Sequence, residues 1–313
     1  MAASSELAVL VACALLLAAA CGGAPDDVPE LEVGYYEETC PEAEAIVRAA
    51  VSEAVAVDAG LIRLLFHDCF VQGCDASVLL DPTALNPRPE KFGPPNFHSL
   101  RGFEAIDAAK AAVEEACPGT VSCADIVAFA ARDASYLLSG YRVDFTMPAG
   151  RLDGRRSNAS DTVPSLPPGS ASFTELVDNF ASKGLDAEDM VVLSGAHSVG
   201  HARCSTFAAD RTDVDAEADI DPSFARSLRR RCARAGNGTG GKEQDEPTRR
   251  VLLASDAALL ETPEAARMVR DSAGVGGRWE KKFAKAMVKM AGIGVKKAGR
   301  HAEIRANCRV VNY

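Results

Sequence analysis

The sequence lacks long hydrophobic runs, paired metal-binding cysteines and an excess of positive charge. No apolar stretch reaches about 18 uninterrupted residues, so we expect no membrane-spanning helix. Its cysteines form no Cys-x-x-Cys pair, which argues against a structural zinc site. The formal net charge of −10 disfavours nucleic acids and anionic membrane surfaces as partners.

Alternating strand patterns and internal repeats are also missing. Instead, apolar residues recur at three-to-four spacing, which predicts helices over 42–55, 101–117, 121–138, 170–184 and 278–292. Ser122 is a candidate N-cap for the third helix, with Asp125 as its capping-box partner, and Gly184 is expected to stop the fourth. We predict an all-α fold.

Two further segments have simple structural interpretations. Trp279, Phe283, Met287 and Met290 form one stripe, which predicts a core-facing helix rather than cofactor lining. The basic run 226–234 predicts a solvated helix face. Between the helical blocks we expect loops rich in Pro and Gly, at 81–96, 147–169 and 236–248.

The N-terminus resembles a secretory signal. Residues 7–20 are an apolar run of 14, too short to span a bilayer, and small residues follow. We therefore expect a signal peptide over 1–23 and a single domain over 24–313. An N-terminal core helix is the alternative.

Cysteine usage supports secretion. Without Cys13 and Cys21 of the signal segment, eight of the ten cysteines remain, an even number that fits four disulfides in an oxidising compartment. Acceptor sequons for N-glycosylation at Asn158 and Asn237 agree with this route.

The stretch LIRLLFHDCFVQGCDASVLL, residues 61–80, places charged groups in an apolar segment. Arg63 and His67 are four residues apart, so they share one helix face. An imidazole that exchanges a proton, beside a guanidinium that stays charged, suits cleavage of an oxygen–oxygen bond. The alternative is an ion-pair scaffold or a chance surface pair.

The residues that follow suggest a cation site. Asp68, Asp75 and Ser77 offer hard oxygen ligands, and Val71 and Gly73 could add backbone carbonyls. This pattern predicts a compact calcium loop, different from an EF-hand. Cys69 and Cys74 flank the loop, and a bridge between them would close it around the ion.

A second histidine pair occurs in VVLSGAHSVGHARC. His197 and His201 have zinc-site spacing, but the Glu that a metalloprotease carries between them is absent. A histidine in an apolar helix is more often a core residue than a ligand. Beside a candidate distal acid/base, however, an axial iron ligand is the sharper interpretation of His197.

From about residue 31 to the C-terminus, the sequence resembles the secretory (class III) plant haem peroxidases. The resemblance rests on blocks in the family's order, among them GYYEETCPEAEAIV, RLLFHDCFVQGCDASVLL, PNFHSLRGFEAID, CPGTVSCADIVAFAARD, GRLDG, VVLSGAHSVGHARC, LLASDAAL and EIRANCRVVN. It implies a two-lobed all-α haem peroxidase fold, with haem b between a distal and a proximal lobe and with long loops pinned by disulfides.

The resemblance also implies roles on the distal side. His67 would be the acid/base and Arg63 would stabilise the transition state. Phe66 would pack over the haem edge. Asn96 would accept a hydrogen bond from His67, and Glu90 would support both that bond and the calcium loop.

On the proximal side, His197 would bind the haem iron and Asp256 would hydrogen-bond its far nitrogen. Pro167 would lie at the aromatic-donor entrance. The distal calcium would take Asp68, Val71, Gly73, Asp75 and Ser77, with support from Glu90. The implied disulfides are Cys40–Cys117, Cys69–Cys74, Cys123–Cys308 and Cys204–Cys232.

The segment 233–255 is shorter than the family pattern. It normally supplies ligands of a second, proximal calcium. Ser198 matches one of these, and Asp245 and Thr248 have suitable spacing for two more, but the closing Asp has no counterpart. A proximal aromatic is also unmatched, since Gln244 is the nearest position. One calcium site is therefore expected, and the second is incomplete.

The function implied is a secreted haem peroxidase that reduces H2O2 and oxidises phenolic or other aromatic donors by one electron. We expect a monomer in the cell wall or vacuole, with no nucleic-acid or membrane partner. The alternative, suggested by the shortened segment, is a haem-poor or inactive extracellular binding protein on the same scaffold. A zinc hydrolase using His197 and His201 lacks a third ligand at any recognisable spacing.

Overall fold

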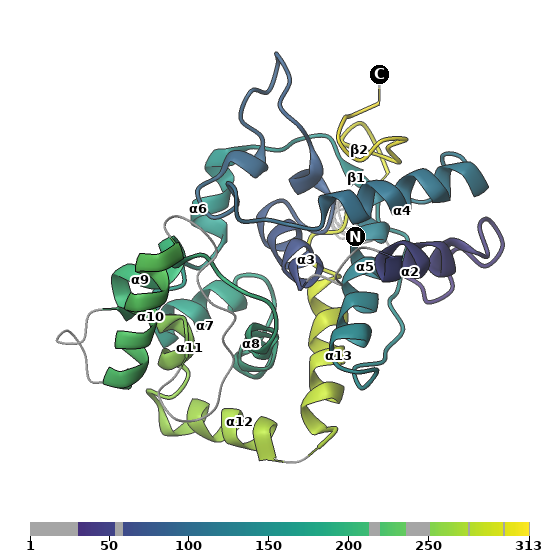
Figure 1. Ribbon diagram of the computed structural model, residues 1–313. Coiled ribbons are helices and arrows are strands. Elements are labelled where there is room, and N and C mark those ends of the chain that lie inside the picture. Colours follow the sequence, from purple (N-terminus) through teal and green to yellow (C-terminus); the bar gives the residue numbers. More distant parts are fainter. Residues whose placement is uncertain are drawn as a thin grey trace, which may run out of the picture. The chain divides into compact units, whose positions relative to one another are not determined.

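Helices and loops make up nearly all of the fold (Figure 1). The structure, a computed structural model, describes residues 31–53, 59–212, 220–235, 251–274, 276–296 and 298–312. Several predicted features lie outside these residues, namely the signal segment 1–23, the sequon at Asn237 and the candidate ligands Asp245 and Thr248.

The described helices confirm the all-α prediction. They are α2 (Ala43–Glu53), α3 (Gly60–Val71), α4 (Phe103–Ala116), α5 (Cys123–Leu138), α6 (Thr162–Ser165), α7 (Phe173–Ala181), α8 (Ala187–Ser194), α9 (Cys204–Arg211), α10 (Pro222–Ala235), α11 (Ala254–Ala258), α12 (Pro263–Gly274) and α13 (Arg278–Met290). Single 3-10 turns are η1 (Ser77–Leu79), η2 (Glu90–Phe92), η3 (Ala159–Asp161) and η4 (Gly195–Ser198). Strands β1 (Asp153–Gly154) and β2 (Ala302–Glu303) pair antiparallel. No described helix combines the length and apolar character needed to cross a membrane.

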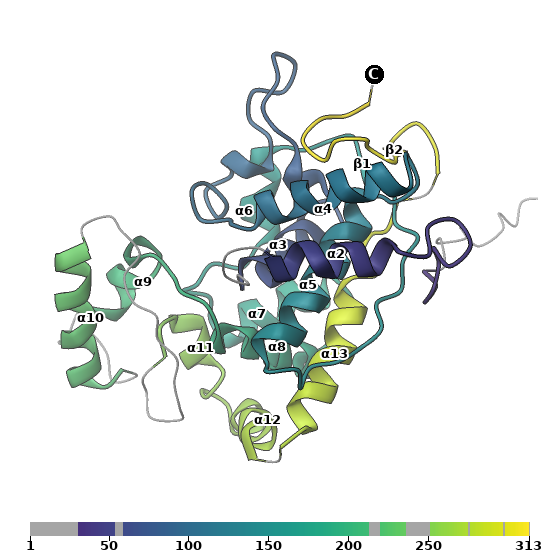
Figure 2. The same cartoon turned by 45° about the vertical axis from the view of Figure 1, so that its right-hand side comes forward.

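The main core is built around α5. Helices α2, α3 and α4 all pack against it (Figures 1 and 2). Most of α3 is buried, including Leu61, Leu64 and Leu65, so this helix is held on nearly every side. The face of α3 that carries Arg63 and His67 is therefore fixed by packing.

The start of α5 is capped as predicted, but by a different arrangement. The Ser122 hydroxyl accepts a hydrogen bond from the Asp125 amide at 3.1 Å, which confirms the N-cap. The prediction that Asp125 completes a capping box is wrong. Its buried carboxylate instead pairs with Arg151 at 2.6 Å and accepts from the Tyr36 hydroxyl at 2.7 Å. A buried cation and hydroxyl stabilise the carboxylate, and the buried Ser122 amide donates to the Tyr36 hydroxyl at 3.4 Å instead.

Two other predicted helices behave as expected. On α13, Phe283, Met287 and Met290 are buried in the main core and Trp279 packs against it, which confirms the core stripe. Helix α7 begins with a capping box between Ser172 and Glu175, and ends at Ala181. The chain then turns through Gly184, whose φ of +76° favours glycine.

A smaller core joins α9 to α10, with Phe207, Phe224 and Leu228 at its centre. The basic run on α10 points away from this core, since Arg226 and Arg230 are exposed, which confirms the solvated face.

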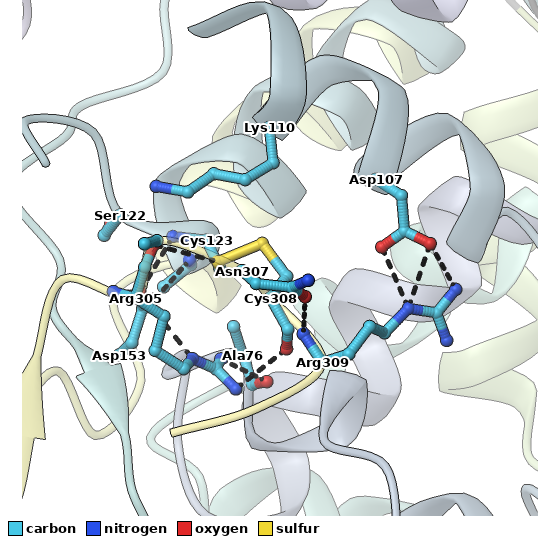
Figure 3. The surroundings of a disulfide bond; sticks show 12 residues. Ala76, Asp107, Lys110, Ser122, Cys123, Asp153, Arg305, Asn307, Cys308 and Arg309 are labelled. Atoms are coloured by element: carbon cyan, nitrogen blue, oxygen red, sulfur yellow. Dashed lines mark hydrogen bonds and ion pairs between the residues drawn. A yellow bond between two sulfur atoms is a disulfide. The ribbon is translucent and has the colours of Figure 1, made fainter. Parts of the chain in front are cut away.

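All four disulfides implied by the resemblance are confirmed. The pairs, with their sequence separations, are Cys40–Cys117 (77), Cys69–Cys74 (5), Cys123–Cys308 (185) and Cys204–Cys232 (28). Figure 3 shows how Cys123–Cys308 attaches the C-terminal segment to the start of α5, beside a bidentate ion pair between Asp107 and Arg309. This bridge brings the last residues of the chain next to the loop that follows α3.

Candidate active site

Arg63 and His67 lie on one face of α3. The His67 ring is buried, and it meets the ring of Phe66 edge to face with centroids 5.1 Å apart. The Arg63 guanidinium donates to the Ser99 carbonyl at 2.9 Å and to the Pro95 carbonyl at 3.0 Å. These two carbonyls fix the cation in place, a support that the sequence patterns did not reveal.

A chain of hydrogen bonds sets the tautomer of His67. Its Nδ1 lies 2.6 Å from Oδ1 of Asn96, whose Nδ2 donates to the Glu90 carbonyl at 2.8 Å. That donation fixes the orientation of the amide, so its oxygen faces the ring and can only accept. The proton therefore lies on Nδ1, which leaves Nε2 of His67 free as a base.

Electrostatics keep this base neutral. Burial, and then the charge of Arg63, lower the pKa of His67 well below its usual value, against a smaller opposing effect of the Asn96 hydrogen bond. Burial and the neighbouring Arg101 lower the pKa of Arg63 to about 10, so it stays charged at neutral pH. A neutral base beside a fixed cation is an arrangement suited to moving one proton.

Glu90 supports Asn96 through its backbone and not through its side chain. Its backbone carbonyl holds the amide, while its carboxylate is buried near the loop that follows α3. At the end of α3, Asp68 accepts from the Ala76 amide at 2.8 Å, and in the loop Asp75 accepts from the Ser77 amide at 3.0 Å. The five candidate distal ligands thus lie on one stretch, with Glu90 beside it.

The loop fits a hard divalent cation. Both carboxylate oxygens of Glu90 and the hydroxyl oxygen of Ser77 are buried, and none has a hydrogen-bond partner among the described residues. Burial first, and neighbouring acids second, raise the pKa of Asp68 and Glu90 well above the usual values. Orphaned oxygens and crowded buried carboxylates are what a calcium ion would relieve.

The identity of the ligands also matters for the type of metal. No cluster of three or more His, Cys, Asp or Glu side chains in the described residues is arranged to hold a metal. The candidate calcium ligands do not form such a cluster, because only two of the five are carboxylates and the others are a hydroxyl and backbone carbonyls. For the zinc alternative, His201 is exposed and finds no such cluster.

His197 lies on η4, directly after α8. Its Nδ1 is 2.8 Å from Oδ1 of Asp256, at the start of α11. The Asp256 charge raises the pKa of His197, while burial opposes it. The His197 side chain is 51% exposed, and because Asp256 engages Nδ1, Nε2 is the nitrogen left for a ligand. A carboxylate on Nδ1 increases the electron donation of Nε2 to a metal.

Arg63 lies close enough to both histidines for its charge to act on each of them. The charge of Arg63 lowers the pKa of His197 as well as that of His67, so the guanidinium acts on both rings. Phe66 is half-buried next to His67. Pro167 is also partly exposed, and its loop is tied to α11 because the Ser255 amide donates to the Gly169 carbonyl at 2.9 Å.

A support on the proximal side was missed by sequence reasoning. The indole of Trp279 donates to the Val192 carbonyl at 3.1 Å, and a Cβ on Gly195 would lie 2.5 Å from its Nε1. Trp279 thus packs against the turn that carries His197, and Gly195 was the one signal of this close approach. Ser198 is exposed, and the other candidate proximal calcium ligands are outside the described residues, so that site remains a prediction.

Comparison with known proteins agrees with this geometry. The sequence profile of the family described as Peroxidase matches residues 43–274. Peroxidase 2 of Zea mays is 52% identical over 330 residues, covering 97% of this chain and 96% of that protein. Peroxidase 1 of Zea mays is 45% identical (99% and 89% covered), and Peroxidase 39 of Arabidopsis thaliana is 41% identical (90% and 93% covered). The chain therefore belongs to the peroxidase family, in the group of plant class III peroxidases, and is a peroxidase enzyme.

Proposed function

We propose that the chain is a secreted haem peroxidase that reduces H2O2 with electrons taken singly from small phenolic or other aromatic donors. The observation that carries this proposal is a pair of histidines with opposite environments and a cation that acts on both. His67 is held neutral by burial and Arg63, and His197 is made a stronger donor by Asp256.

The residues suggest how each step is assisted. Haem b, when bound, would supply the redox chemistry, with His197 Nε2 as the ligand of its iron and Phe66 against its edge. His67 Nε2 would accept a proton from one oxygen of H2O2 and return it to the other as the bond between them breaks. Arg63 would stabilise the negative charge on the departing oxygen. Two donor molecules would each give one electron and one proton, so that H2O2 leaves as two waters.

We assign the distal calcium to Asp68, Val71, Gly73, Asp75 and Ser77, with Glu90 nearby. The ion would fix the end of α3 and thereby the position of His67. A proximal calcium at Ser198, Asp245 and Thr248 remains a prediction. Pro167 is assigned to the entrance for the aromatic donor.

Secretion as a monomer, to the cell wall or vacuole, is part of the same proposal. Its support is the set of four disulfides, which persist in oxidising compartments. An inactive binding protein is the alternative if the shortened segment 233–255 moves Asp256 away from His197. The 2.8 Å contact of Asp256 with His197 argues against that displacement.

The test is an absorption spectrum of the secreted protein before and after one equivalent of H2O2, with His67→Ala as the decisive variant. We expect the variant to keep the Soret band and to react with H2O2 at least about 100-fold more slowly. His197→Ala should disturb haem binding itself. Replacement of the exposed His301 by alanine is the control and should change neither property. Full peroxide reactivity in His67→Ala would refute the assignment of the base.

A further inference from the structure

The segment that follows α13 crosses the candidate calcium loop. The Cys74 amide donates to the Ile293 carbonyl at 2.9 Å. The two backbones approach so closely that a Cβ on Gly73 would lie 2.4 Å from the Gly294 carbonyl oxygen. Because Gly294 lies against Gly73, Lys296, two residues further on, lies next to the calcium loop.

The Lys296 ammonium lies directly on the loop. Its Nζ is 3.3 Å from Oδ2 of Asp75 and donates to the Gln72 carbonyl at 2.5 Å. Gln72 stands between Val71 and Gly73, the two candidate carbonyl ligands. The ammonium therefore neutralises part of the charge on a candidate ligand and also holds the backbone between two others.

The charges around the loop suggest a role for the contact between Lys296 and Asp75. Asp68, Asp75 and Glu90 are three buried carboxylates around one loop. A second nearby cation, Arg305, donates to the carbonyls of Ala76 and Cys308, and its charge is shared between Asp153, 3.7 Å from its Nε, and Asp68 (Figure 3). With a divalent ion and Lys296 in place, the three carboxylates are neutralised.

We propose that Lys296 is an internal counter-cation of the distal calcium loop, which holds the loop together when calcium is absent and weakens its affinity for calcium. The inference rests on the proposed distal calcium site. Two positive charges next to one carboxylate repel each other, so the ammonium opposes the binding of the ion that it partly replaces. The rival explanation is a partly exposed ion pair that contributes almost nothing.

The experiment measures calcium affinity directly. The haem-loaded, secreted protein is depleted of calcium and titrated with calcium against a competing chelator, for the wild type, Lys296→Met and Lys296→Arg. We expect Lys296→Met to bind calcium about tenfold more tightly, since it removes a screened charge at close range. Its melting temperature should fall without calcium and match the wild type with calcium. Lys296→Arg keeps the charge and should resemble the wild type.

Lys282→Met is the matched control. Lys282 lies on α13 and pairs with Glu188 of α8 at 2.5 Å, so its removal takes away a lysine ion pair elsewhere. Its calcium affinity should be unchanged. Ser77→Ala identifies the loop among the sites titrated, because it deletes one candidate ligand and should weaken that site alone.

The outcomes distinguish the proposed role of Lys296 from the proposed distal calcium site. Equal or weaker calcium binding by Lys296→Met, or an arginine variant that behaves like the methionine variant, overturns the role of Lys296 and leaves the calcium site intact. A wild type that binds no calcium, or Ser77→Ala with unchanged affinities, overturns both. Haem binding and peroxide reactivity are read independently from the absorption spectrum, so failure of the peroxidase proposal itself would be seen there.

Discussion

His67 and His197 show how one type of side chain acquires two chemistries. An amide oxygen on Nδ1 holds a proton without adding charge, so burial keeps His67 neutral. A carboxylate on Nδ1 adds a full negative charge, which raises the pKa of His197 in spite of burial. The difference between Asn96 and Asp256 therefore separates a base from a metal ligand.

The lowered pKa of His67 predicts an acid limit. Above that pKa the imidazole is neutral and can accept a proton, so the reaction with H2O2 should be insensitive to pH through 6.5 and slow only at lower pH. Asn96→Asp would place a charge on Nδ1 and raise the pKa. We expect the acid limit of this variant to move to higher pH, as measured by stopped-flow rates of peroxide reaction. An acid limit at the same pH in both proteins would contradict the tuning role of Asn96.

At the scale of single residues, the sequence predicted the candidate catalytic side chains but not the groups that hold them in place. Charged residues in an apolar helix identified Arg63 and His67. The sequence near Arg63 does not predict that the Ser99 and Pro95 carbonyls bind its guanidinium, because backbone acceptors have no sequence signature. The same holds for Glu90, whose carbonyl binds the Asn96 amide.

Among the elements, the start of α5 depends on a residue outside the helix. Asp153, in the GRLDG motif, accepts from the amides of Cys123 and Ala124 at 3.0 and 2.8 Å. It also accepts from the Arg305 amide at 2.8 Å. One buried carboxylate thus caps the central helix and fixes the C-terminal segment, although burial raises its pKa.

Replacement of Asp153 by asparagine should destabilise the fold. The amide keeps one acceptor and brings an NH2 group against the donors of α5, at a cost of about 2–4 kcal/mol. Urea unfolding followed by circular dichroism measures this change. Asp144→Asn, at an exposed position, is the control and should stay within about 0.5 kcal/mol of the wild type. Equal stability of the two variants would show that the cap contributes little.

Helix prediction succeeded where periodicity and caps agreed, as in α5 and α7, and where a long apolar stripe was present, as in α13. The capping box assigned to Asp125 failed because tertiary partners outcompeted a local one: Arg151 and Tyr36 come from distant positions in the chain. The predicted loops 81–96 and 147–169 contain η2, η3 and the four-residue α6. Such short turns are too brief to show a helical period.

For the whole molecule, the disulfides Cys123–Cys308 and Cys204–Cys232 stabilise different parts of the fold. Cys123–Cys308 closes 185 residues and joins the C-terminal segment to α5, whereas Cys204–Cys232 closes 28 and joins α9 to α10. Of these two bridges, Cys123–Cys308 is the one linked to the calcium loop, which the Cys69–Cys74 bridge also closes, through the contact of Arg305 with the Ala76 carbonyl. Their loss should therefore have different consequences.

Serine replacement of Cys123 and Cys308 should cost about 5 kcal/mol of stability and weaken calcium binding, because Arg305 loses its anchor. Replacement of Cys204 and Cys232 should cost about 3–4 kcal/mol and leave calcium affinity unchanged. Thermal unfolding with and without calcium, together with chelator competition, measures both effects. Equal calcium affinities in the two double variants would contradict the link between the bridge and the loop.

The family and the bridges could be predicted at this scale, because long motifs occur in a fixed order. The position of Asp256 could not. The segment before it is short, and α11 is located by a hydrogen bond from Ser255 to Gly169, residues far apart in sequence. Sequence alone therefore left open whether Asp256 reaches His197.

The crossing of the calcium loop by the C-terminal segment has a consequence for biosynthesis. The loop after α3 is made more than 200 residues before Ile293, Lys296 and Arg305, the residues that contact it. Contacts of such long sequence separation form late in folding. The calcium loop should therefore close only after the segment that follows α13 has been made, so a chain interrupted directly after α13 would contain every catalytic side chain and still leave this loop without its closing contacts.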